Sequence, residues 1–321
     1  MAAIERNPSV FHVLKSKTAI ITGGANGIVA EVVRLFHSHG ANVVIADLLS
    51  TKTAAETLIS SLSSRVVFIP TDILTWQSMV SLFNQTVSLF GSVELVVANA
   101  GMMESKPYYE FEEDENGDLK EPKESYRVID VNLKGTMNTL RLAIYYMRKN
   151  QPSFADGSKG SVVLISSTSG YFGGTGVVSY VSSKHGVTGL LRSSQRNANR
   201  HGVRVNGVAP FFTPTYITSS YSQSWKESGL PANSVQDVAW AFAQTATDLK
   251  YKGACILVRA PALLMNTKLM MKAFGSVMKE IEIPRTQLLS MWLGEDVSES
   301  SARAGALFES LGGYPLPKPK I

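Results

Sequence analysis

The chain has 321 residues, of which 44% are hydrophobic and 18% charged, a composition typical of a globular protein with a sizeable core. Its formal net charge of +5 is small, and no long run of lysine or arginine accompanies it, which argues against a nucleic-acid partner. No uninterrupted apolar run approaches the roughly 20 residues that cross a bilayer, so we expect no membrane segment.

Strand and helix patterns alternate from residue 17 to about residue 258. Helical periodicity predicts helices over residues 28–40, 51–61, 76–91 and 123–150, and one that runs through Tyr180 to about residue 201. Short apolar runs predict seven strands, over residues 18–22, 42–46, 66–70, 93–98, 161–165, 203–208 and 254–258. Because these runs are continuously apolar rather than alternating, both faces of each strand are buried. The sequence therefore predicts an α/β fold, a doubly wound seven-stranded parallel sheet, in a first domain of residues 1–258.

Residues 259–321 follow the last predicted strand, and we expect them to form a C-terminal helical extension that packs on this domain or on a partner subunit. The portion over residues 263–281 is rich in methionine and other apolar residues. It would either line a pocket for a bulky apolar substrate or pack as an ordinary helix.

A second unusual segment, residues 108–124, is acidic and contains the turn pair Asn116-Gly117. Residues 110–124 carry eight acidic side chains against two lysines. We expect an exposed loop on the ligand side of the sheet, which is either solvated surface or a gate to the pocket.

A glycine-rich turn, T-G-G-A-N-G-I-V over residues 22–29, follows the first strand and begins the first helix. Such a turn lets backbone N–H groups approach a pyrophosphate at the helix N-terminus. Asp47 ends the second strand, where a carboxylate accepts hydrogen bonds from both ribose hydroxyls of an adenosine and repels a 2′-phosphate. These features favour NAD over NADP, and the alternative for Asp47 is a simple turn residue after the strand.

Tyr180 and Lys184 are four residues apart, which places them on one face of the predicted helix. A free phenol is a poor base near pH 7, and a neighbouring ammonium favours the phenolate. Ser166 and Ser167 follow a buried strand at its carboxyl end, where open α/β sheets bind ligands. Taken alone, a tyrosine and a lysine at this spacing occur by chance on many amphipathic helices.

With these pieces placed, residues 17–258 resemble the short-chain dehydrogenase/reductase family, which adopts the Rossmann fold. The finer similarity is to fungal secondary-metabolite and prostaglandin-dehydrogenase-like members. Ser167 precedes Tyr180 by thirteen residues, the usual spacing of the family, which selects it over Ser166. The matching motifs are T-G-x-x-x-G at residues 22–27, Asp72 after the third strand, A-N-A-G at residues 98–101, Asn132, Ser167, Tyr180 and Lys184.

The resemblance implies a catalytic role for four of these residues. Tyr180 would exchange a proton with the substrate oxygen while hydride moves between the nicotinamide and the adjacent carbon. Lys184 would lower the pKa of the tyrosine and hold the nicotinamide ribose, and Ser167 would stabilise charge on the substrate oxygen. Asn132 would anchor a water that relays protons from Lys184. The cofactor-binding positions that the resemblance implies are Gly23, Asn26, Gly27, Ile28, Asp47, Asp72, Asn99, Ala100, Gly101, Tyr180, Lys184, Pro210 and Thr215; no metal-ligand pattern is present.

Three positions depart from the family pattern. Val29 replaces the last glycine of the turn, which would either weaken NAD binding slightly or abolish it. Phe211 follows Pro210 where the family has glycine, and together with Phe212 it would line the nicotinamide pocket or fill the core. Arg259 stands where the family has aspartate after the last strand.

We therefore expect an NAD(H)-dependent oxidoreductase that interconverts a secondary alcohol and a ketone on a fairly apolar, polycyclic or secondary-metabolite substrate. The alternative is a scaffold altered at Val29 and Phe211 that catalyses a non-redox isomerisation or cyclisation, or only binds ligand. A homodimer or homotetramer is expected through the helices of residues 126–150 and 180–201. The single cysteine, Cys255, and the lack of a leader pattern favour a cytoplasmic location.

Overall fold

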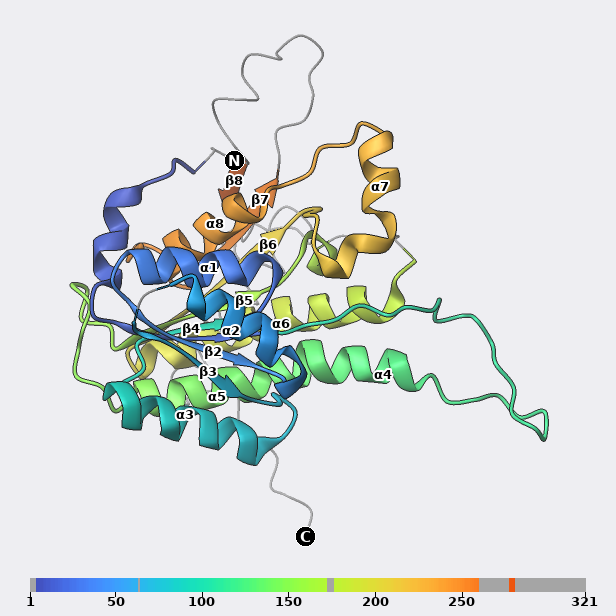
Figure 1. Ribbon diagram of the computed structural model, residues 1–321, viewed down its shortest axis with the longest axis horizontal. Helices are drawn as coiled ribbons and strands as arrows, with labels where there is room; N and C mark the ends of the chain where they lie inside the picture. The colour runs from blue at the N-terminus through green and yellow to red at the C-terminus, as the bar shows by residue number, and fades with distance from the viewer. Residues whose placement is uncertain (1–3, 63, 172–175, 260–276, 281–321) are drawn as a thin grey trace, which may run out of the picture. The chain divides into compact units, whose positions relative to one another are not determined.

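The structure of the chain is a computed structural model that describes residues 4–62, 64–171, 176–259 and 277–280. Its centre is one eight-stranded sheet in the order β3-β2-β1-β4-β5-β6-β7-β8 (Figure 1). Seven of these strands pair in parallel, which confirms the predicted doubly wound sheet. The parallel strands are β1 (Thr18–Thr22), β2 (Asn42–Asp47), β3 (Val66–Pro70), β4 (Leu95–Ala98), β5 (Gly160–Ile165), β6 (Val203–Pro210) and β7 (Cys255–Arg259).

The central strands are buried on both faces. Every residue of β1, β4, β5 and β6 is buried. This is the environment that the continuously apolar runs of the sequence predict. Because β1 is flanked by β2 and β4, the strand order reverses between them, and a ligand-binding crevice is expected at that point.

Helices cover both faces of this sheet. On one face α1 packs against α8, and on the other α3 and α6 pack against α5 (Figure 1). The helix bounds are α1 (Gly27–Ser38), α2 (Lys52–Ser60), α3 (Trp76–Phe90), α4 (Lys123–Ile129), α5 (Thr136–Met147), α6 (Val178–Arg200), α7 (Ser219–Glu227) and α8 (Val235–Thr247), with short 3-10 helices at Pro8–Leu14, Leu49–Thr51, Thr168–Gly170 and Tyr216–Thr218. None of the helices in the described part of the chain has the length and hydrophobicity that a membrane span requires.

Two helical features differ from the sequence predictions. The helix expected over residues 123–150 is interrupted by a π-helical turn, Asp130–Gly135, between α4 and α5. Such turns occur mostly as local insertions at functional sites. Helices α7 and α8 were not predicted, and nine of the thirteen residues of α8 are buried, so its buried side chains extend beyond one narrow stripe.

The helical extension predicted over residues 259–321 is wrong at Val277–Glu280, which forms strand β8. This strand pairs antiparallel with β7, with Leu257 opposite Lys279. Without β8, one edge of β7 would present unpaired backbone groups, and the added strand satisfies them. The chain divides into two compact units, Met1–Glu280 and Ile281–Ile321, and the rest of the predicted helical extension lies outside the described residues.

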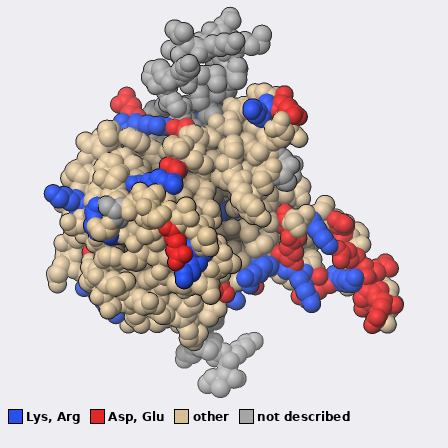
Figure 2. All heavy atoms as spheres, in the orientation of Figure 1, with Lys and Arg blue, Asp and Glu red and all other residues tan. Residues whose placement is uncertain are grey.

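The acidic segment forms an exposed hairpin arm between β4 and α4. Residues 109–121 are all exposed, and Glu113 and Leu119 form an antiparallel bridge. At its tip the Asp114 carboxylate accepts hydrogen bonds from the backbone N–H of Asn116 at 2.8 Å and of Asp118 at 3.0 Å. The arm is the green trace that extends away from the sheet in Figure 1, and its carboxylates form the red cluster of Figure 2.

A buried arginine ties the end of α8 to the sheet. Arg204 of β6 is 1% exposed, and its guanidinium donates hydrogen bonds to the carbonyl oxygens of Ala246 at 2.7 Å and of Asp248 and Tyr251 at 3.3 Å. Burial lowers the pKa of this guanidinium, and the Asp156 and Asp248 carboxylates oppose that shift. Removing one partner from a buried charged network leaves the other polar groups without compensation.

We expect Arg204→Met to lower the free energy of unfolding by about 3 to 5 kcal/mol, because the three carbonyl groups lose their donor inside the protein. Urea unfolding followed by circular dichroism measures the change. The matched control is Lys252→Met, since Lys252 is largely exposed and pairs with Asp156 at the surface. That control should change stability by less than about 1 kcal/mol. Equal effects of both variants would contradict the role given to Arg204.

Candidate active site

The predicted site residues lie on the side of the sheet that is formed by the carboxyl ends of the parallel strands. Ser167 follows β5, Asn99 follows β4, and Pro210 is the last residue of β6. Tyr180 and Lys184 lie on the first two turns of α6, and the Lys184 Nζ atom is 5.5 Å from the centre of the Tyr180 ring. The structure therefore places the four residues that are predicted to be catalytic on neighbouring elements, with Asn132 on the π-helical turn.

Lys184 is a buried ammonium with few contacts. Its side chain is 3% exposed, and Nζ donates a hydrogen bond to the Ile165 carbonyl at the end of β5, at 3.1 Å. Burial lowers the pKa of Lys184 from 10.5 to about 8. The ammonium form still predominates at pH 7, so a positive charge lies near the phenol of Tyr180 in a poorly solvated place.

The two serines after β5 have different surroundings. The Ser166 hydroxyl is 2.9 Å from the Thr188 hydroxyl, and a Cβ atom on Gly170 would lie 2.6 Å from it, so this position is fully packed. Ser167 has extended backbone and its Oγ accepts a hydrogen bond from the Ser169 N–H at 3.1 Å, which leaves the hydroxyl hydrogen for another acceptor. This difference supports Ser167 as the residue that meets a substrate oxygen.

Asn132 fixes the loop that follows β4. Its Nδ2 group donates to the Met102 carbonyl at 2.8 Å and to the Ser183 hydroxyl at 2.9 Å, and its Oδ1 atom accepts from the Met102 N–H at 2.8 Å. A Cβ atom on Gly101 would lie 3.0 Å from Oδ1, which explains a glycine at this close approach. The amide group therefore contacts the loop and α6, and the proton-relay role stays a prediction.

The glycine-rich turn has the shape of a cradle for a pyrophosphate. Gly23 has a φ of +69°, and a Cβ atom there would lie 2.8 Å from the Ala100 Cα atom. The Thr22 hydroxyl accepts hydrogen bonds from the N–H groups of Asn99 at 3.1 Å and Ala100 at 3.3 Å, which joins the first turn to the loop after β4. Thr215 lies beside Gly27, whose Cβ position would be 3.7 Å from the threonine methyl.

The N-terminus of α1 has no side-chain cap, because Asn26 makes no such hydrogen bond. The first N–H groups of a helix attract an anion when nothing else satisfies them. Ile28 is half-buried in this first turn. The missing side chain at Gly23 makes room for Ala100. The glycine-rich turn and the uncapped start of α1 together fit the phosphates of a dinucleotide.

Two aspartates have structural contacts of their own. The Asp47 carboxylate accepts hydrogen bonds from the N–H of Ala25 at 3.2 Å and of Leu48 at 2.8 Å, which holds it beside the glycine-rich turn. The Asp72 carboxylate accepts from the Leu74 N–H at 2.9 Å and from the Thr75 hydroxyl at 3.3 Å, which shapes the turn before α3. Each carboxylate retains lone pairs for a ligand.

Two of the three departures from the family pattern, Val29 and Phe211, are packed without conflict, and the third, Arg259, is exposed at the end of β7. Val29 is 1% exposed and belongs to the core cluster that also contains Phe242 of α8, so its side chain points away from the cradle. Phe211 and Phe212 both contact Trp225 of α7, with ring centres at 5.6 Å and 4.2 Å. The two phenylalanines are half-buried and form an aromatic cluster with Trp225 at the end of β6.

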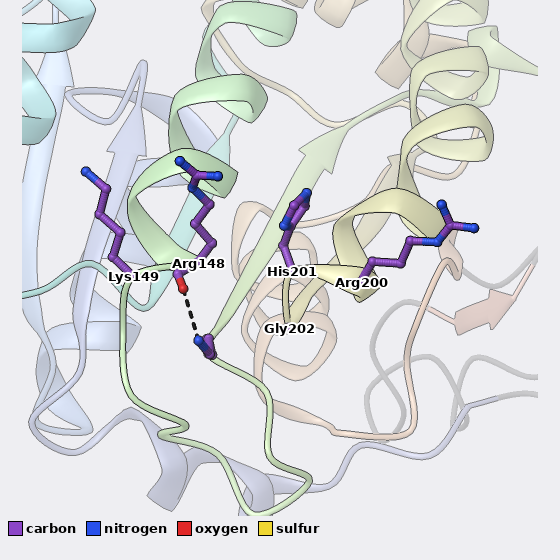
Figure 3. Close-up of a pocket in the computed structure, with 6 residues that line it drawn as sticks. Arg148, Lys149, Arg200, His201 and Gly202 are labelled. Atoms are coloured by element: carbon purple, nitrogen blue, oxygen red, sulfur yellow. Dashed lines mark hydrogen bonds between the residues drawn. The ribbon is translucent and has the colours of Figure 1, made fainter. Parts of the chain in front are cut away.

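A hollow of about 440 Å³ lies at the opposite edge of the sheet and is separate from this site (Figure 3). It is lined by the basic ends of α5 and α6, including Arg148, Lys149 and Arg200. The Lys159 Nζ atom donates a hydrogen bond to the Arg148 carbonyl oxygen at 3.0 Å.

Among the described residues, no group of three or more His, Cys, Asp or Glu side chains is placed to hold a metal ion.

The burial of Lys184 predicts how the free energy of unfolding changes with pH. Because its folded-state pKa of about 8 lies below the ordinary 10.5, the unfolded chain binds more protons between these values. The contribution of Lys184 to the free energy of unfolding therefore rises with pH from about 8 to 10.5. Below pH 8 the buried ammonium costs about 3 kcal/mol of folding free energy.

We expect Lys184→Met to be more stable than wild type at pH 7 by about 2 kcal/mol, after the lost hydrogen bond to Ile165 is allowed for. The difference should shrink as the pH rises from 8 to 10.5. Urea unfolding at a series of pH values measures it, with Lys226→Met, an exposed lysine of α7, as the control without such a trend. If the two free energies of unfolding differed by a constant amount across this pH range, burial of the Lys184 ammonium would not destabilise the folded protein.

Comparison with known proteins now identifies the family. Residues 17–226 match the short chain dehydrogenase family. The chain is 35% identical over 234 residues to a short-chain dehydrogenase/reductase, prx4, of the fungus Penicillium roqueforti, covering 73% of this chain and 66% of that protein. It is 33% identical to (+)-borneol dehydrogenase 1 of Salvia officinalis, covering 64% and 73% of the two chains. The crystal structure of 3-hydroxyacyl-CoA dehydrogenase type-2 from Mycobacterium avium superposes with a TM-score of 0.67 at 26% identity, covering 77% of this chain and 96% of that one. The match to prx4 spans slightly less than two thirds of that protein. The family match shows that the chain belongs to the short-chain dehydrogenase family of oxidoreductases, as its sequence motifs predict.

Proposed function

We propose that the protein is an NAD(H)-dependent oxidoreductase that interconverts a secondary alcohol and a ketone on a fairly apolar substrate. The observation that carries this proposal is the buried Lys184 ammonium, 5.5 Å from the Tyr180 ring at the carboxyl edge of the sheet. A bound nicotinamide cofactor would accept or donate the hydride. The protein would supply the proton, the position of the substrate and the electrostatic environment.

Each catalytic residue has a distinct part in this proposal. Tyr180 takes the proton from the alcohol oxygen during oxidation and returns it during reduction. The Lys184 ammonium stabilises the phenolate that forms on Tyr180. The Ser167 hydroxyl donates a hydrogen bond to the substrate oxygen as negative charge develops there.

NAD, rather than NADP, is the proposed cofactor. Asp47 lies beside the glycine-rich turn, where its carboxylate would accept hydrogen bonds from ribose hydroxyls and repel a 2′-phosphate. No arginine or lysine is present in residues 22–29 to hold that phosphate. Asp72 and the residues 99–101 would contact the adenosine half, and Pro210 and Thr215 the nicotinamide half.

The substrate class rests on two observations. The relatives named for (+)-borneol and for 3-hydroxyacyl-CoA are named for secondary alcohols. The cluster of Phe211, Phe212 and Trp225 adds apolar surface at the end of β6. We therefore propose polycyclic and secondary-metabolite alcohols as the substrates. The side chain of Val29 is buried in the core, which favours the redox function over the non-redox alternative.

Large apolar side chains on the outside of α4 and α5 support self-association. Tyr126, Met137 and Tyr145 are 50%, 49% and 44% exposed. Burying them against a second copy would remove this apolar area from water. We propose a homodimer or homotetramer through these helices, and the cytoplasmic location stays a prediction.

We expect Tyr180→Phe to lower kcat at least about a hundredfold, because the phenylalanine cannot transfer a proton. Ser167→Ala should act in the same direction. NADH absorbance with cyclohexanol, 1-tetralol and (+)-borneol as substrates measures turnover, and calorimetry should show nearly unchanged NAD⁺ binding. The control is Tyr109→Phe, since Tyr109 is 68% exposed on the arm. Near-full activity of Tyr180→Phe would refute the mechanism.

Asp47→Asn tests the choice of cofactor. Wild type should bind NAD⁺ at least about tenfold more tightly than NADP⁺, and the variant should lose most of that preference, because hydrogen bonds to a charged group and the repulsion of the 2′-phosphate both disappear. Calorimetric titration with each dinucleotide gives the two affinities. Asp114→Asn on the arm is the matched control. A preference that survives in Asp47→Asn would assign cofactor selection to other residues.

A further inference from the structure

We propose that Glu104 is a positioning residue, which acts through the first turn of α6 to hold Tyr180 in place. This inference rests on the proposed function, because Tyr180 is the proton-transfer residue of that proposal. Glu104 belongs to the loop between β4 and the hairpin arm, and it matches none of the motifs recognised in the sequence.

The carboxylate of Glu104 makes both of its described contacts with the backbone of α6. Oε1 accepts a hydrogen bond from the Ser179 N–H at 2.9 Å, and Oε2 accepts one from the Tyr180 N–H at 3.0 Å. These are the second and third residues of the helix, whose N–H groups have no partner within it.

The helix itself provides no substitute for this contact. Val177 occupies the N-cap position, and its side chain makes no capping hydrogen bond. Glu104 therefore takes the part of the missing cap from a distant segment of the chain. Its charge adds to the effect, since a carboxylate is stabilised near the positive end of the helix dipole and forms short, strong hydrogen bonds.

The loop that carries Glu104 is itself anchored on both sides. Asn132 binds both backbone groups of Met102. The Glu124 carboxylate accepts hydrogen bonds from the backbone N–H of Ser105 at 3.0 Å and from its hydroxyl at 2.7 Å. Glu104 thus extends from a fixed base rather than from a free loop.

The backbone of Tyr180 is held at both of its polar groups. Glu104 accepts its N–H, and the Ser183 hydroxyl donates to its carbonyl at 2.7 Å. Ser183 in turn accepts a hydrogen bond from Asn132. Asn132 and Glu104 therefore join the loop after β4 to α6 at the residue whose phenol must meet the substrate.

Such a contact matters for rate because proton transfer depends on position. A misplacement of about 1 Å can lower a rate about a hundredfold. Without Glu104, the two N–H groups would turn to water and the first turn of α6 would fray more readily. The phenol of Tyr180 would then spend less time in its productive position, while the dinucleotide cradle at the first turn of α1 would be unaffected.

The test compares Glu104→Ala with Glu104→Gln, which keeps an oxygen that accepts hydrogen bonds. Glu110→Ala, an exposed residue of the arm, is the control. Amide hydrogen exchange at Ser179 and Tyr180 measures the cap. Turnover of 1-tetralol or (+)-borneol gives kcat and KM, and calorimetry gives NAD⁺ affinity.

We expect the two amides to exchange at least about tenfold faster in Glu104→Ala, and kcat to fall about ten- to a hundredfold. NAD⁺ affinity should stay within about twofold of wild type. Glu104→Gln keeps only one of the two accepting oxygens and loses the charge, so it should restore kcat in part, and Glu110→Ala should match wild type. Unchanged exchange or unchanged kcat in Glu104→Ala would overturn the proposal, as would a Glu104→Gln variant as slow as Glu104→Ala.

A spectroscopic measurement separates this proposal from the proposed function. In protein labelled with ¹³C at the tyrosine Cζ atom, the Tyr180 signal is assigned by its absence from Tyr180→Phe. If wild type oxidises none of the alcohols, the proposed function fails, and this signal still decides the role of Glu104. A Tyr180 signal that moves in Glu104→Ala and lies closer to its wild-type position in Glu104→Gln supports the proposal, whereas a signal unchanged in both variants refutes it.

Discussion

The parallel direction of the central strands is the constraint on which the site depends. Because β1, β4, β5 and β6 all run the same way, their carboxyl ends meet at one edge. The glycine-rich turn, the loop after β4 and Ser167 are therefore brought together by strand pairing alone. The strand order reverses around β1, between β2 and β4, which is where open α/β sheets bind their ligands, and the chemistry of the loops there determines what is bound.

The site contains a buried positive charge, the Lys184 ammonium, although taking a charge out of water is unfavourable. Lys184 is buried with one described hydrogen-bond partner, the Ile165 carbonyl, and its lowered pKa expresses the free energy that this burial costs. A methionine would fill the space with less conflict. Retaining an ammonium beside Tyr180 makes sense if its value lies in catalysis, because the charge acts more strongly on a phenolate in a poorly hydrated place than in water.

The sequence was informative where the signal is local. Continuous apolar runs predicted the seven parallel strands, and the spacing of Tyr180 and Lys184 placed both on one helix face. Helix α8 escaped detection because it is buried nearly all round, and β8 because the open edge of β7 makes it a strand. The break in the helix at Asp130–Gly135 was also missed, since it accompanies contacts between Asn132 and Met102, which are far apart along the chain.

Glu104 shows the same limit within the site. In the sequence it is one carboxylate close to a segment that contains eight acidic residues, and nothing in its neighbours distinguishes it. Only the fold brings it to the N-terminus of α6, where Val177 leaves two N–H groups for a partner. Local patterns can identify the groups that exchange protons and bind the cofactor. The residues that hold those groups in position are defined by contacts between distant segments, and a single sequence contains no periodic signal for such contacts.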